Sequence, residues 1–137
     1  MEEMRVVLHA PRETVREKVT AAMLACDIPV AQSSADVIEA RYGTETALFG
    51  QYDLTTHVYV VGLNDSTTLV RLSGQETSKT GKALNPTVNT RPISNKNHGR
   101  SGNAWVQLRN VAKQLRADPA LHVDFPASTH LNLVYAR

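Results

Sequence analysis

The chain has 137 residues, 42% of them hydrophobic and only 5% aromatic, which fits one domain with an aliphatic core. No stretch approaches the roughly 18 consecutive apolar residues of a membrane span, so we predict no transmembrane segment. The net charge of +2 conceals a separation of charge, because residues 1–76 carry 6 Lys/Arg and 11 Asp/Glu whereas residues 77–117 carry 8 Lys/Arg and no acid.

The N-terminal part predicts a strand followed by a helix. Residues 4–9 have the composition of a strand, and Pro11 suits the first turn of a helix, where its missing N–H costs nothing. Apolar residues then recur at helical spacing up to Cys26, and Asp27 and Pro29 end the helix. Cys26 is the only cysteine, and we interpret it as a small buried residue instead of a catalytic thiol.

A run of short strands separated by turn residues follows. The strongest pattern is that of residues 54–63, rich in β-branched side chains, and the turn after it makes 67–73 its hairpin partner. The weakest pattern is that of 46–51. The predicted strands are 28–32, 37–42, 46–51, 54–63 and 67–73.

The second half predicts a loop and a helix. Residues 74–100 are polar and rich in turn-forming residues, so we expect a long loop, and a loop of about 25 residues is commonly functional. Ser101 or Asn103 can cap a helix that runs to residue 117, with Trp105 as the large residue of its apolar stripe.

The last segment, 118–137, predicts an extended tail. Leu131, Leu133 and Tyr135 alternate with their neighbours as in a strand. This tail can add a strand to the chain's own sheet, or it can lie on another protein, with backbone hydrogen bonds supplying affinity. We therefore divide the chain into a domain, 1–117, that includes the basic loop 74–100, and the tail.

The order of the predicted elements is β-α-β-β-β-β-α, with the tail as an optional last strand. Strands that cluster between two helices favour an α+β fold, and we predict a two-layer domain whose mostly antiparallel sheet carries both helices on one face. The same order argues against a doubly wound α/β fold.

Several short segments resemble a known family, namely Val6-Val7-Leu8, Ala10-Pro11, Ile28-Pro29-Val30 and residues 35–41. With the closing amphipathic helix, their order is similar to that of the helix-grip domains of small bacterial envelope lipoproteins, which include the C component of the outer-membrane β-barrel assembly machine. The resemblance implies a non-enzymatic adaptor or assembly role in the periplasm or cell envelope, and it carries over no catalytic residue. Taken literally, the N-terminus lacks a secretory leader and predicts a cytoplasmic protein.

No catalytic motif is recognisable. A phosphate-binding glycine-rich loop and a nucleophile elbow are absent, and the histidines lack the spacing of a zinc site. We therefore predict no cofactor, no metal and no catalytic residue. An enzyme would need a pocket converging on Glu39, Asp53 or His57, which no pattern in the sequence brings together.

The most unusual feature is the basic tract between residues 77 and 117, whose cations create a local positive field. The candidate partner- or anion-binding residues are Lys79, Lys82, Arg91, Lys96, Arg100, Arg109, Lys113 and Arg116.

Three interpretations of this tract compete. It can be a solvated loop neutralised by the acidic first half, a contact for an acidic protein or an anionic membrane surface, or a nucleic-acid site. The last is weakened because Trp105 is the tract's only aromatic residue, whereas single-strand binders interleave aromatic residues with charge. We predict a non-enzymatic binding or accessory subunit of a larger bacterial complex that uses the basic loop and the tail residues Leu131, Leu133 and Tyr135, with a nucleic-acid-binding domain as the alternative.

Overall fold

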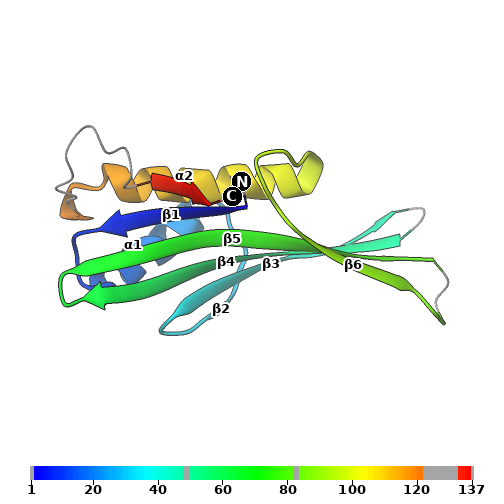
Figure 1. Cartoon of the computed structure of the whole chain (residues 1–137), viewed down its shortest axis with the longest axis horizontal. Helices are drawn as coiled ribbons and strands as arrows, with labels where there is room; N and C mark the ends of the chain where they lie inside the picture. Colours follow the sequence, from blue (N-terminus) through cyan, green and yellow to red (C-terminus); the bar gives the residue numbers. More distant parts are fainter. Residues whose placement is uncertain (1, 48–49, 82–83, 122–132, 137) are drawn as a thin grey trace.

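The computed structural model describes residues 2–47, 50–81, 84–121 and 133–136. Its elements are β1 (Glu3–Leu8), α1 (Arg12–Ala25), β2 (Val30–Ser33), β3 (Val37–Ala47), β4 (Gly50–Asn64), β5 (Thr67–Thr80), β6 (Thr87–Pro92), α2 (Gly99–Ala117), a 3-10 turn (Pro119–Leu121) and β7 (Leu133–Ala136). The fold is α+β, with an antiparallel sheet and two helices, as the order of the predicted elements indicated (Figure 1).

The sheet has the strand order β2-β3-β4-β5-β1-β7, and β6 also pairs with β5. β4 accompanies β5 along its whole length on one edge. The opposite edge of β5 is shared, because β1 pairs with Thr68–Ser73 and β6 pairs with Gln75–Thr80. β1 and β6 therefore follow one another along the same strand, and β5 joins two differently built halves of the sheet.

The core lies between the sheet and the helices. Burial alternates along β4 and β5: every second residue, among them Leu54, Val58, Val70 and Leu72, is buried, and the residues on the opposite face are partly exposed. α1 and α2 contribute their apolar stripes to the same cluster, and Trp105 of α2 is only 2% exposed. Full burial of one such aliphatic side chain contributes about 1.5–3 kcal/mol, so this half of the sheet carries the hydrophobic stabilisation.

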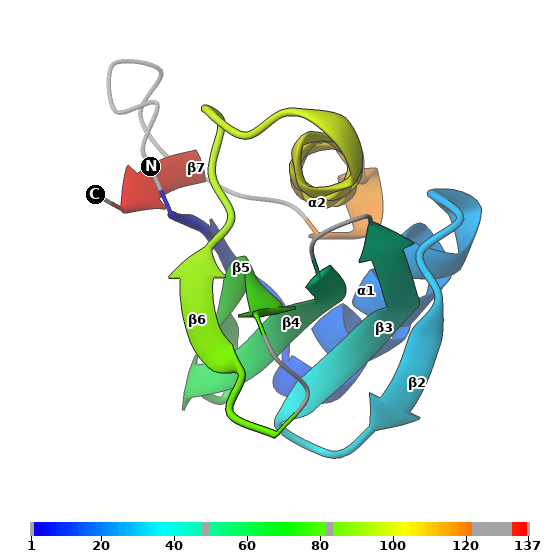
Figure 2. The same ribbon diagram turned by 90° about the vertical axis from the view of Figure 1, so that its right-hand side faces the viewer.

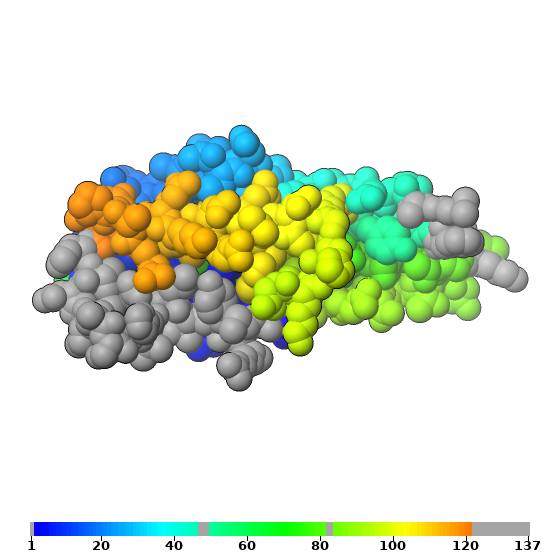
Figure 3. Space-filling view, turned by 90° about the horizontal axis from the view of Figure 1, so that it is seen from above, coloured from blue at the N-terminus to red at the C-terminus, as the bar shows by residue number. Residues whose placement is uncertain are grey.

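Beyond the helices the sheet continues as an arm, defined here as residues 43–53 and 75–92 (Figures 1 and 3). Among the arm residues whose burial the structure describes, none is buried. Figure 2 looks along the sheet and shows β6 next to β5, at the opposite side of the molecule from β2. In its described residues the arm is thus held by backbone pairing, by a side-chain hydrogen bond between Thr77 and Thr90 and by contacts at its base, without buried residues of its own.

The structure differs from the predicted loop at 74–100. β5 continues to Thr80, and β6 occupies 87–92 and pairs with it in register from Gln75↔Pro92 to Thr80↔Thr87. The sequence is polar there because both faces of the hairpin are exposed, and polarity on both faces removes the alternation that identifies a half-buried strand. The weak strand predicted at 46–51 is divided between the end of β3 and the start of β4.

The tail contributes β7 to the chain's own sheet. β7 pairs with β1 from Glu3↔Ala136 to Val6↔Leu133, and Leu121 at the start of the tail is buried. Tyr135 and Leu133 therefore stand in the sheet, whereas Leu131 lies outside the described residues.

Candidate functional site

The outer edge of β6 is the first candidate site. The N–H of Ile93, which follows β6, donates to the carbonyl of Gly74 at 2.9 Å. Because hydrogen-bonding direction alternates along an antiparallel strand, the N–H groups of Val88 and Thr90 point away from β5. Pro92 occupies the next outward position and has no N–H to offer. In the described part of the chain β6 pairs only with β5, so these backbone groups face solvent.

Two predicted cations flank this edge. Lys79 is the cross-strand partner of Val88, and Arg91 is the partner of Glu76. Since successive residues of a strand face opposite sides, Lys79 lies on the helix-free face of the arm and Arg91 on the other face. Both residues are exposed. Lys82, in the connection between β5 and β6, lies outside the described residues.

Arg100 joins the arm to α2. Its guanidinium donates to the carbonyl oxygens of Gly43 at 3.0 Å and Tyr52 at 2.7 Å, and its Nε lies 3.4 Å from a carboxylate oxygen of Glu45. Next to it, the Ser101 hydroxyl donates to Glu76 of β5. The predicted anion ligand Arg100 is thus engaged by the chain itself, and it fixes the base of the arm.

The remaining cations of the tract lie apart from the arm edge. Lys96 is exposed in the connection before α2, and Lys113 and Arg116 are exposed on α2. Arg109 is partly exposed one turn before Lys113. The tract is continuous in sequence, but the fold divides it between the arm and α2.

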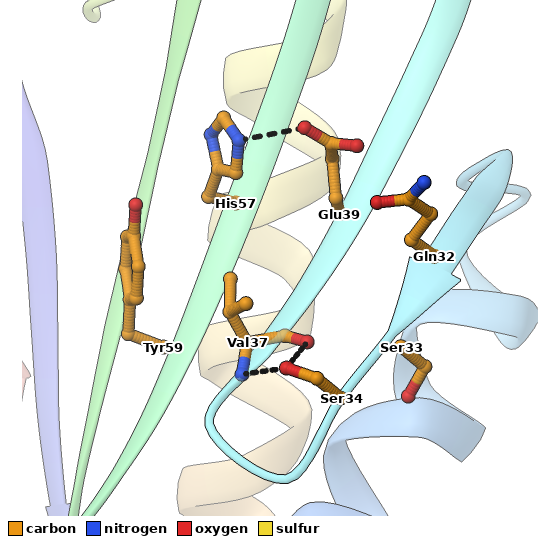
Figure 4. A pocket seen from close by; sticks show the side chains of 7 residues that line it. All are labelled: Gln32, Ser33, Ser34, Val37, Glu39, His57 and Tyr59. Atoms are coloured by element: carbon orange, nitrogen blue, oxygen red, sulfur yellow. Dashed lines mark hydrogen bonds and ion pairs between the residues drawn. The ribbon is translucent and has the colours of Figure 1, made fainter.

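A second candidate site is a pocket of about 560 Å³ in the covered half of the sheet, the half that packs against α1 and α2, on the face away from these helices (Figure 4). Its lining residues come from β2, β3 and β4 and the turn between β2 and β3: Gln32, Ser33, Ser34, Val37, Glu39, His57 and Tyr59. Here the structure brings together two of the three residues that an enzyme would need, because His57 Nε2 lies 3.1 Å from Glu39 Oε1. The β3–β4 register pairs Glu39 with His57 directly. A correct prediction of this hairpin register from the sequence would therefore have placed the two residues together.

Charge and aromatic contacts organise this pocket. Burial raises the pKa of Glu39, but the hydrogen bond from His57 and the charge of Arg41 outweigh it and hold that pKa below its usual value. The rings of His57 and Tyr59 stack with centroids 5.9 Å apart, and Arg71 lies over Tyr59 at 5.6 Å. Asp53, the third residue considered, instead accepts a hydrogen bond from Thr44 in the arm.

Cys26 has the surroundings of a structural residue. It packs against the core, and its thiol contacts the side-chain amide of Gln114. Burial, and then the charge of Asp27, raise the pKa of this thiol. A raised pKa keeps the group in the thiol form, which is the less nucleophilic one.

Among the described residues, no group of three or more His, Cys, Asp or Glu is placed to hold a metal ion. No helix in the same part of the chain has the length and apolar character needed to cross a membrane.

Comparison with known proteins returns nothing similar: no family model matches the chain, and no curated protein and no solved structure resembles it significantly. The resemblance to helix-grip envelope lipoproteins therefore stays a prediction, and functional reasoning depends on the geometry of the chain itself.

Proposed function

We propose that the protein is a non-enzymatic binding domain, an accessory subunit of a larger bacterial assembly, and that it contacts a protein partner through the arm. The observation that carries this proposal is that four strands continue past the helices without burying a residue whose burial is described. Ordering such a segment costs backbone entropy, and without apolar burial little within the domain offsets that cost. An ordered, exposed extension is better explained as a surface for another molecule than as a part of the core.

The tail is left out of the proposed contact. Its strand β7 pairs with β1 through one edge and ends the chain's own sheet. We place the contact on the arm because the arm is ordered although none of its residues with described burial is buried.

The proposal is tested by site-specific photocrosslinking in the native host. A photoreactive residue replaces Val88, which is 54% exposed on the arm, and in a matched control it replaces Leu63, which is 53% exposed at the other end of β4. We expect discrete crosslinked products from position 88 and none of the same products from position 63. The same products from both positions, or none from position 88, would contradict an arm interface.

The nucleic-acid alternative finds less support in the geometry, because the basic tract is divided and Arg100 is internally bonded. Its test is the salt dependence of oligonucleotide binding. Contacts to phosphates would lower the logarithm of affinity by roughly 0.9 per contact for each logarithmic unit of salt on duplex DNA. A response that is flat in salt would remove this alternative.

A second candidate function, binding of a small polar molecule, is favoured by the convergence of Glu39 and His57 in the pocket. The pair offers a charged acceptor and an imidazole beside the ring of Tyr59. A small-molecule screen by thermal shift on the natural protein, repeated on His57→Ala, would support it if stabilisation by a compound disappears in the variant. Equal stabilisation of both proteins would place the binding elsewhere.

A further inference from the structure

The free edge of β6 indicates how a partner would bind, and this inference rests on the proposed function. We infer that the partner adds a short, extended and acidic segment to β6, pairing with Val88 and Thr90 as an additional strand. Strand addition of this kind takes its affinity from main-chain hydrogen bonds and its selectivity from side chains at alternate positions.

The backbone of β6 sets the length of that segment. Val88 and Thr90 each present one outward N–H and one outward C=O, so four hydrogen bonds are offered. Pro92 closes this row at one end, and Pro86 immediately precedes the strand at the other. Because proline cannot donate, pairing is restricted to the few residues between the two prolines. The edge is thus open but short, which admits one defined register and limits uncontrolled sheet extension.

The side chains around the edge set its chemistry. Val88 is 54% exposed and shares one face with Thr90, whereas Arg91 and Asn89 share the other face. A strand in which apolar and acidic residues alternate would place its apolar side chains over Val88 and its carboxylates beside Arg91. A second copy of β6 paired in parallel and in register would place its own Arg91 next to this one, and like charges on neighbouring strands are destabilising. Arg91 on one face and Lys79 on the other favour an acidic partner segment over a basic one.

The edge of the sheet at β2 is not equivalent to that at β6. It has four residues and a register irregularity against β3. Arg16 of α1 also donates to Ser33 Oγ and to the carbonyl of Ser34 at the end of β2. Both features are ways in which proteins protect edge strands, so β6 is more open to pairing than β2.

The test uses a fluorescent, end-capped peptide of alternating Glu and Val as the probe and the full chain as the receptor, with binding followed by anisotropy. Thr90→Pro removes one outward N–H and leaves the backbone hydrogen bonds to β5 intact; it also removes the hydroxyl contact with Thr77 of β5, which the control Thr90→Ala removes as well. We expect it to weaken binding about tenfold or more, because one lost backbone hydrogen bond is joined by the steric bulk of the ring. The matched control Thr90→Ala keeps the N–H and should bind within about twofold of the natural protein.

If Thr90→Pro disturbs the fold of the arm, the charge-swap variant Arg91→Glu tests strand addition independently. Arg91→Glu should weaken binding of the Glu–Val peptide and strengthen binding of a Lys–Val peptide relative to the natural chain. Absence of peptide binding to the natural protein, or unchanged affinity in both Thr90→Pro and Arg91→Glu, would overturn strand addition. Preference for a single-stranded oligonucleotide over the peptide would overturn it as well.

These outcomes are separable from failure of the proposed function. If the crosslinks from position 88 persist while the peptide does not bind, the arm remains the interface and only strand addition is wrong. If the peptide binds but position 88 gives no products of its own in the host, the arm interface itself is contradicted.

Discussion

The two halves of β5 differ in burial, although they belong to one continuous strand. From Thr68 to Leu72, alternate residues are buried under the helices, whereas from Gln75 to Thr80 no residue is buried. The backbone ladder with β4 continues through both halves. Hydrogen bonding therefore specifies where the strand goes, while burial decides which half stabilises the domain, since a solvent-exposed backbone hydrogen bond adds little net free energy.

The largest expected effect comes from comparing one core residue with one arm residue. Leu72→Ala should lower the free energy of unfolding by about 2–5 kcal/mol, because it removes a fully buried side chain. Val88→Ala should change it by less than about 0.5 kcal/mol. Urea unfolding of both variants measures the difference, and comparable losses would mean that the arm is part of the cooperative core.

Gly74 marks the boundary between the two halves. A Cβ added there would lie 2.7 Å from Ile93 Cδ1 and 2.9 Å from the carbonyl oxygen of Thr55. Gly74→Ala should therefore destabilise the protein by about 1–3 kcal/mol, because the backbone has to move. The control is Ser73→Ala, one residue earlier on the helix-free face, which should be nearly neutral in the same urea titration. Equal stability of the two variants would show that the close packing at Gly74 against Ile93 and Thr55 does not contribute to stability.

Arg100 tests how the arm is held to the domain. Arg100→Ala removes the hydrogen bonds to the carbonyls of Gly43 and Tyr52, at a cost of about 1–2 kcal/mol. Amide hydrogen exchange should accelerate in the arm segments of β3 and β4 and remain slow in β1. Arg109→Ala, on the same helix, provides the control. If amide exchange accelerated equally through the whole sheet, the idea that Arg100 specifically anchors the arm would be contradicted.

The smallest expected effect concerns charge on the helix-free face of the covered half. The pKa of Glu39 is lower in the folded state than its usual value of 4.5, so its carboxylate stabilises the fold above that pH. This contribution is lost as the pH falls through the lowered pKa. Glu39→Gln should therefore be less stable than the natural protein at neutral pH, and the two should converge as the pH falls below the lowered pKa of Glu39. A difference that is constant with pH would exclude this linkage.

The elements predicted correctly from the sequence are those with one buried face, and the elements that were missed lie in the arm. β1, the strong strand within β4, and both helices were predicted because one face of each is buried, which leaves a periodic pattern. β6 and the outer part of β5 were missed because exposure on both faces leaves no such pattern. Composition alone made Thr87–Pro92 look like a loop, although it pairs with β5 at every position.

The candidate sites were predicted unevenly for a related reason. The unusual charge of residues 77–117 was visible in the sequence, but its division between the arm and α2, and the internal bonding of Arg100, depend on tertiary structure. Glu39 and His57 were each noted, yet their contact requires the β3–β4 register. Register is set by long-range packing and by the turn, and a one-residue shift would have placed them on opposite faces.

The most direct test of the account is crosslinking from position 88 in host cells that carry Thr90→Pro, with the unfolding free energy of the purified variant measured in parallel. We expect that the products formed by the protein with natural Thr90 disappear while stability changes by less than about 0.5 kcal/mol. Undiminished products in a stably folded Thr90→Pro variant would contradict the claim that the free edge of β6 binds the partner.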